Sequence, residues 1–153
     1  MFKRILLLSC VAALCCATPG TVKIEQQNVP LNLLQEVAVR SLPAGRGRTS
    51  INGREFYSKF FVPEGRVRFW GKPKSNAKSR YYARIIILGD RRPYDVDIIV
   101  IKQELVKSWG KSEQSFEDIG ASQKYGHQFA DYFKVNLTKS LKDRNFIDDF
   151  RVF

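Results

Sequence analysis

Two apolar runs give the clearest hydrophobic pattern in the chain. Residues 85–88 and 98–101 are entirely aliphatic, and they belong to β-branched and aromatic stretches at 81–88 and 94–101 that are separated by Gly89 to Pro93. This spacing predicts an antiparallel hairpin with a short loop. Because so many consecutive positions are apolar, we expect both strands to be central in a sheet and covered on more than one side.

Two other segments have helical periodicity. Leu34, Val37, Ala38 and Ser41 form one apolar stripe between Pro30 and Pro43, which predicts a first helix. The second helix is predicted by apolar residues three and four positions apart: Tyr125, Phe129, Tyr132, Phe133, Leu137 and Leu141. We expect it to run for about five turns, at 3.6 residues per turn, and to end near Asn145.

The remaining patterns are shorter. Residues 22–26 alternate and predict a short edge strand, while 54–62 and 66–70, joined by a Pro-Glu-Gly turn, predict a second hairpin. We expect loops at 71–79 and 107–122, and an extended tail after residue 145 that packs back on the domain.

These elements combine into one architecture. We expect an α+β two-layer sandwich, in which an antiparallel sheet of four or five strands carries both helices on one face. Residues 18–153 are too few to divide comfortably into two domains, so we expect a single domain. The sheet face away from the helices is then free to bind a partner.

The first residues have the pattern of a secretory signal sequence. Lys3 and Arg4 precede an apolar run from Ile5 to Ala17, which is too short to span a bilayer as a helix, and a Thr-Pro-Gly break follows. Cleavage after Ala17 would remove all three cysteines of the protein. The alternative is a lipoprotein signal, with Cys16 as the lipidated residue. Either form is expected in the periplasm or outer envelope, with no transmembrane helix in the mature chain.

Charge is distributed unevenly along the sequence. Between Arg40 and Arg92 there are fourteen basic and three acidic residues, whereas the part from Pro93 onward has nine basic and ten acidic residues. Aromatic residues are interleaved with the basic ones. A cationic region of this kind attracts anionic polymers and surfaces. We therefore predict an anionic-ligand face that comprises Arg54, Arg66, Arg68, Trp70, Lys72, Lys74, Arg80 and Arg84.

The expected cellular location restricts the kinds of partner that the protein can meet. For an exported protein we expect the partner to be an anionic component of the envelope, such as a glycolipid, a phospholipid headgroup or a cell-wall polymer. An acidic protein is the alternative partner. Nucleic acid is disfavoured because exported proteins seldom meet it, although basic residues between aromatic rings are also typical of single-strand binders. The architecture is similar to that of small periplasmic lipoproteins that assist outer-membrane assembly or lipopolysaccharide transport, and this similarity implies an accessory role.

Catalytic signals are weak. His127 is the only histidine, so a histidine-based metal site or catalytic triad has little support, and we expect no metal, no cofactor and no enzymatic activity. Asp95 and Asp97 lie two apart on a predicted strand and therefore share a face. They give the alternative hypothesis of a small periplasmic hydrolase.

Overall fold

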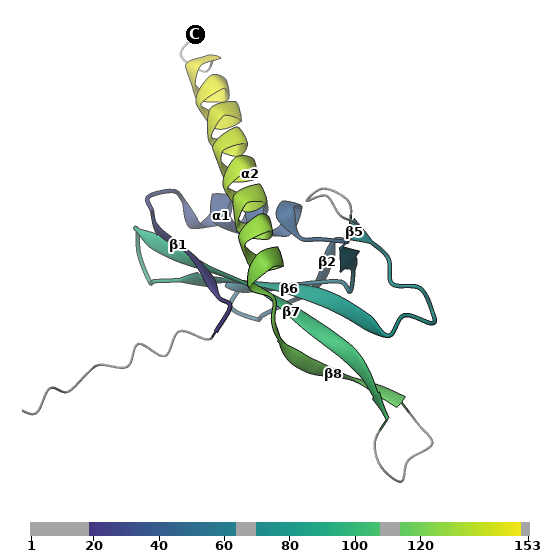
Figure 1. Cartoon of the computed structure of the whole chain (residues 1–153). Coiled ribbons are helices and arrows are strands. Elements are labelled where there is room, and N and C mark those ends of the chain that lie inside the picture. The colour runs from purple at the N-terminus through teal and green to yellow at the C-terminus, as the bar shows by residue number, and fades with distance from the viewer. Residues whose placement is uncertain (1–18, 64–69, 108–113, 151–153) are drawn as a thin grey trace, which may run out of the picture.

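The computed structural model describes residues 19–63, 70–107 and 114–150 (Figure 1). Two helices and eight strands follow one another in these parts of the chain: β1 (Val22–Gln27), α1 (Leu31–Ser41), β2 (Arg46–Thr49), β3 (Glu55–Ser58), β4 (Val62–Pro63), β5 (Trp70–Gly71), β6 (Ser79–Leu88), β7 (Tyr94–Lys107), β8 (Gln114–Ala121) and α2 (Gln123–Phe150). The predicted signal segment, including Cys16, lies outside the described residues.

The main sheet is antiparallel. Its strand order is β1-β7-β6-β3-β2, and β8 also pairs with β7. The long strand β7 has two neighbours on one side: β1 pairs with residues 94–98, and β8 pairs with residues 101–107. The short strands β4 and β5 pair separately. The expected α+β class, with one antiparallel sheet and two helices, is confirmed.

The hairpin formed by β6 and β7 is the centre of the sheet, as the two apolar runs predict. The strands pair without interruption from Ser79 opposite Glu104 to Leu88 opposite Asp95. Alternate residues of β6 point to opposite faces, so that Ala83, Ile85 and Ile87 are buried while Arg80, Tyr82 and Arg84 lie on the other side. We call the side that carries these three polar residues the open face.

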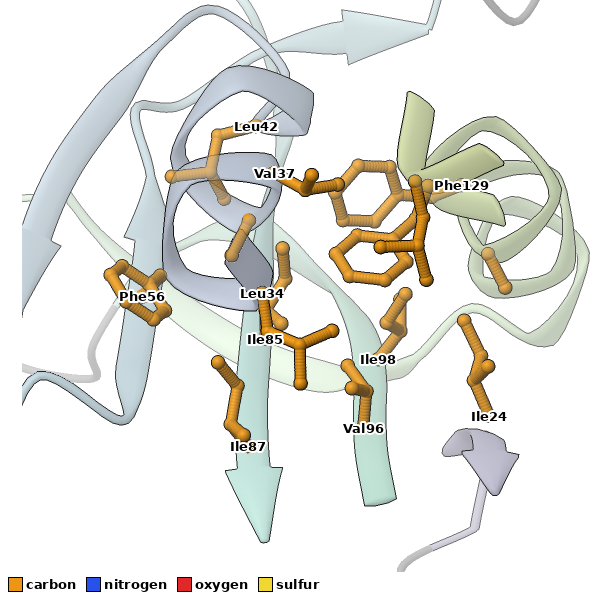
Figure 2. Packing of buried hydrophobic residues seen from close by; sticks show 14 of the residues in the cluster. Ile24, Leu34, Val37, Leu42, Phe56, Ile85, Ile87, Val96, Ile98 and Phe129 are labelled. Atoms are coloured by element: carbon orange, nitrogen blue, oxygen red, sulfur yellow. The ribbon is translucent and has the colours of Figure 1, made fainter. Parts of the chain in front are cut away.

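Both helices cover the opposite side of the sheet (Figure 1). Leu34 and Val37 of α1 and Phe129 of α2 pack against Ile85 and Ile98 of the central strands, as Figure 2 shows. Leu34, Val37, Phe129, Ile85 and Ile98 are all completely buried, with exposed fractions of 0%. The core therefore lies between the helices and the sheet, and the C-terminal part of α2 projects beyond it (Figure 1).

Two predicted irregular segments are regular in the structure. Residues 114–121 form β8 instead of a loop. Most of their side chains are exposed, so the segment has no apolar alternation from which a strand could be recognised. The helix α2 continues to Phe150, which makes the prediction of an extended tail after residue 145 wrong for these residues.

The predicted second hairpin is also wrong in detail. Residues 54–62 are divided into β3, which pairs with β2 and β6, and β4, which pairs with β5. At the end of β3 the buried hydroxyl of Ser58 accepts a hydrogen bond from the amide of Ala83 at 2.8 Å, in place of a main-chain partner. Arg66 and Arg68 lie outside the described residues, so their predicted shared face with Trp70 is not described.

Candidate anion-binding surface

A hollow of about 280 Å³ lies where the connection from β5 to β6 meets β4. Its lining consists of Val62, Lys72, Lys74, Asn76, Ala77, Lys78 and Ser79, and we call it the lysine hollow. The amide of Ala77 donates to the carbonyl of Lys74 at 3.0 Å, which closes a turn. This turn reverses the chain, so that the lysines before and after it line the same hollow.

Among the described residues, no acidic neighbour balances the charge of the lysine hollow. None of the described residues that line it is acidic. Glu104, which lies opposite Ser79 in the sheet, forms an ion pair with Lys102 instead. Lys72, Lys74 and Lys78 are exposed and form no ion pair with the described residues. Their ammonium groups are therefore available to an anion that bears several negative charges.

The other residues of the predicted face are dispersed. Arg84 and Arg80 lie four residues apart on the open face of β6, whereas Arg54 lies at the far end of this strand, where its guanidinium donates to the carbonyl of Gly89. Trp70 is described only as part of the backbone of β5. The structure thus brings together Lys72 and Lys74 from the predicted set and adds Lys78 to them.

Arg84 already has an internal partner. Its Nη2 donates to Oε1 of Glu55 at 2.9 Å, across the pairing of β3 with β6. This hydrogen bond holds the pKa of Glu55 below its usual range, and a second one from the hydroxyl of Tyr57 acts in the same direction. The charge of Arg84 is therefore largely neutralised, and the residue fits a structural role better than ligand binding.

A second hollow, of about 360 Å³, lies on the open face beside β8. Ile99 and Ile101 of β7 line it together with Ile119, Pro19 and Arg84. The pairing of β7 with β8 shifts register between Lys102 and Gln103, which leaves Ile119 unpaired and 55% exposed. Such a bulge redirects a side chain. The sequence pattern predicts a loop at 107–122 and therefore contains no signal for this hollow.

The outer side of α2 carries a second group of lysines. Lys134, Lys139 and Lys142 surround the exposed Val135. Their spacing along the helix places the three lysines on one side. The nearly equal numbers of basic and acidic residues from Pro93 onward do not reveal this grouping. This lysine group has the same charge as the lysine hollow, and it provides a matched control for experiments on that hollow.

Asp95 and Asp97 both lie on the open face of β7, but their surroundings differ. Oδ1 of Asp95 accepts a hydrogen bond from the amide of Gln26 at 2.9 Å, where β1 shifts register against β7. Oδ1 of Asp97 is buried and has no hydrogen-bond partner among the described residues. Burial raises the pKa of Asp97, against the opposing effect of Lys23. Asp95 therefore has a structural role in holding the irregular part of β1.

His127 lies exposed on α2. Within the described parts of the chain, no three His, Cys, Asp or Glu residues are grouped so that they could hold a metal ion. No helix in those parts combines the length and the apolar character needed to cross a membrane.

Comparison with known proteins adds no family. The chain matches no protein-family model, no curated protein and no solved structure.

Proposed function

We propose that this chain is an exported, non-enzymatic protein of the cell envelope that binds a phosphate-bearing component at the lysine hollow. The observation that carries the proposal is the convergence of Lys72, Lys74 and Lys78 on one hollow, and none of the described residues in its lining is acidic. Ammonium groups on flexible stems bind phosphate oxygens as point charges, without a fixed bidentate geometry. A phosphate-bearing lipid headgroup and a phosphate-bearing cell-wall polymer both present this chemistry.

Two further features support this proposal. The signal-like segment at residues 1–17 favours an extracytoplasmic address, with Cys16 as a candidate for lipidation. The concentration of basic residues between Arg40 and Arg92 would increase the rate at which an anionic surface is encountered. Asn76 and Ser79 add an amide and a hydroxyl to the hollow, and both can donate hydrogen bonds to phosphate.

The experiment compares two sources of phosphate. Binding of the purified protein is measured to vesicles of phosphatidylcholine with and without phosphatidylglycerol, and to soluble polyphosphate, at increasing salt. We expect binding to the phosphatidylglycerol vesicles or to polyphosphate, with an affinity that falls as salt rises. Binding to the vesicles alone would indicate a lipid headgroup, and binding to polyphosphate alone would indicate a polymer.

Matched triple variants separate the hollow from the general charge of the protein. Lys72→Ala/Lys74→Ala/Lys78→Ala should weaken binding about a hundredfold, since each lysine near an anionic surface contributes roughly 1 kcal/mol. The control Lys134→Ala/Lys139→Ala/Lys142→Ala removes the same charge from α2 and should have a much smaller effect. Equal losses in both variants, or no binding by the unaltered protein, would refute the proposal.

A further inference from the structure

Arg80 lies between two aromatic rings on the open face. Its guanidinium carbon is 3.6 Å from the ring centroid of Phe60 and 3.9 Å from that of Phe116. Phe60 follows β3 and Phe116 belongs to β8, so the two rings come from segments far apart in the sequence. Cation–π contacts at these distances hold the guanidinium against both rings.

Arg80 is held in place by a chain of hydrogen bonds that ends at a carboxylate. Its Nε donates to Oε1 of Gln103 at 2.8 Å, and Nε2 of Gln103 donates to Oδ1 of Asp118 at 2.7 Å. The hydroxyl of Tyr82 donates to Oδ2 of Asp118 at 2.9 Å. Both carboxylate oxygens of Asp118 therefore accept hydrogen bonds. The group that contacts Arg80 directly is the neutral side-chain amide of Gln103, not the carboxylate of Asp118.

Arg80 consequently has no counter-ion among the described residues. It forms no ion pair with any residue that the structure describes. Among the described residues, Arg80 donates one side-chain hydrogen bond, and it comes from Nε. The two terminal nitrogens of the guanidinium therefore donate none there. Burial lowers the pKa of Arg80, which reflects the cost of removing this cation from water. An anion that approaches the terminal nitrogens would offset this cost.

The arrangement also reduces the entropic cost of binding. A free arginine side chain loses rotamer freedom when it captures a ligand, whereas Arg80 is already fixed by two rings and one hydrogen bond. The two terminal nitrogens of a fixed guanidinium form a planar fork that matches the two oxygens of a carboxylate. Phe60 is 41% exposed and offers an apolar surface beside this fork.

We propose that Arg80, clamped between Phe60 and Phe116, is a receptor for a carboxylate of a protein partner, whose neighbouring apolar group packs on Phe60. The exposed ring of Phe60 beside the fork favours a carboxylate that is attached to an apolar group. The lysine hollow takes no part in this site, so the present proposal goes beyond the proposed function and either can fail without the other. A chain-terminal carboxylate and an acidic side chain share the required chemistry.

Three short peptides test this proposal by calorimetric titration of the full chain. The first is Phe-Glu blocked at both ends, which offers a side-chain carboxylate. The second is acetyl-Ala-Phe with a free C-terminus, which offers a terminal carboxylate. The third is Phe-Gln blocked at both ends, and it is the neutral control. We expect at least one carboxylate peptide to bind and the neutral peptide not to bind, and the peptide that binds identifies the source of the carboxylate.

Two variants connect the binding to Arg80 itself. Arg80→Lys keeps the charge but loses the planar fork, and Gln103→Glu places a carboxylate beside Arg80 as an internal competitor. Each should weaken peptide binding at least tenfold. Gln103→Glu preserves the size of the side chain, and circular dichroism checks that the fold is retained. The lysine-hollow triple variant should bind the peptides as the unaltered protein does.

Other results would overturn the proposal. Unchanged affinity in both Arg80→Lys and Gln103→Glu would show that the carboxylate binds elsewhere. Binding of inorganic phosphate without binding of either carboxylate peptide would show that the ligand class is wrong. Absence of binding by all peptides and by phosphate would show that Arg80 has only a structural role in joining β6 to β8.

Discussion

Asn136 of α2 donates a hydrogen bond to the hydroxyl of Ser41 of α1 at 2.9 Å, across 95 positions in the sequence. Ser41 is 1% exposed, so water cannot replace this partner. The two helices are also joined at the surface, where Arg144 contacts Glu36 at 3.4 Å. The buried hydrogen bond should contribute more than the exposed ion pair, because solvent screens the latter.

Replacing Asn136 by alanine should therefore destabilise the protein. The change leaves a buried hydroxyl without its donor, which typically costs about 1–3 kcal/mol. Thr138→Ala is the control on the same helix, since Thr138 is exposed and should change the free energy of unfolding by less than about 0.5 kcal/mol. Urea denaturation of both variants measures the difference, and equal stability would contradict the role of Asn136.

Ser58 provides a second test at the point where β3 leaves β6. Its hydroxyl accepts from the amide of Ala83 at 2.8 Å and donates to the carbonyl of Lys59 at 2.7 Å. In Ser58→Ala the buried amide of Ala83 loses its partner, so we expect a loss of about 1–3 kcal/mol in urea denaturation. Ser58→Thr keeps the hydroxyl and should recover part of this loss; if alanine were tolerated fully, the serine would not be substituting for a sheet partner.

Asp97 should be a source of instability at neutral pH. Burial raises its pKa in the folded protein above the unfolded value, so the folded state favours the protonated form. The associated stability is complete below the unfolded pKa and is lost as the pH rises through the folded pKa. Asp97→Asn should therefore raise the unfolding free energy at pH 7 and give a smaller gain in acid.

The same variant bears on the alternative of a hydrolase. An enzyme that uses Asp95 and Asp97 would gain stability in Asp97→Asn but lose turnover. A binding protein would retain its affinity for anions. Measuring unfolding at several pH values together with anion binding distinguishes these outcomes, and a decrease in stability at pH 7 would contradict the assignment of an unpartnered carboxylate.

Tyr82 should give a pH dependence in the alkaline range. Burial, together with the hydrogen bond to Asp118, raises the pKa of Tyr82 to about 12, from its ordinary value of 10.0. The stability that this shift represents is fully present below pH 10 and is lost between pH 10 and about pH 12. Thermal unfolding of the protein and of Tyr82→Phe should therefore converge as the pH rises through this window. Parallel curves would show that Tyr82 titrates normally.

The sequence predicted best those elements whose partners are local. The hairpin of β6 and β7 follows from two apolar runs and a short loop, and α1 follows from Leu34, Val37 and Ala38. By contrast, β8 is mostly exposed and is stabilised by pairing with β7, a relationship that hydrophobic alternation does not encode. A strand of this kind becomes visible only once its neighbour is known.

The candidate sites show the same limit. Lys72 and Lys74 were predicted from the basic segment, and Lys78 follows from the turn between them. Arg84 forms an ion pair with Glu55, whereas Arg80 has no ion-pair partner among the described residues. The number of charges in the sequence does not reveal this difference. Phe60 and Phe116, which clamp Arg80, come from segments that only the sheet brings together. Aromatic interleaving was the available signal, but it does not identify which ring contacts which cation.

The position of β1 has a consequence for the time at which the chain can fold. In the described structure β1 pairs with β7 alone, some seventy positions later, and its Ile24 is buried in the same core as Phe129 and Phe133 of α2. During folding the β6–β7 hairpin can form early, because its contacts are local, whereas β1 can pair and be buried only after both β7 and α2 are available. This side of the core is therefore completed late, when α2 packs over β1.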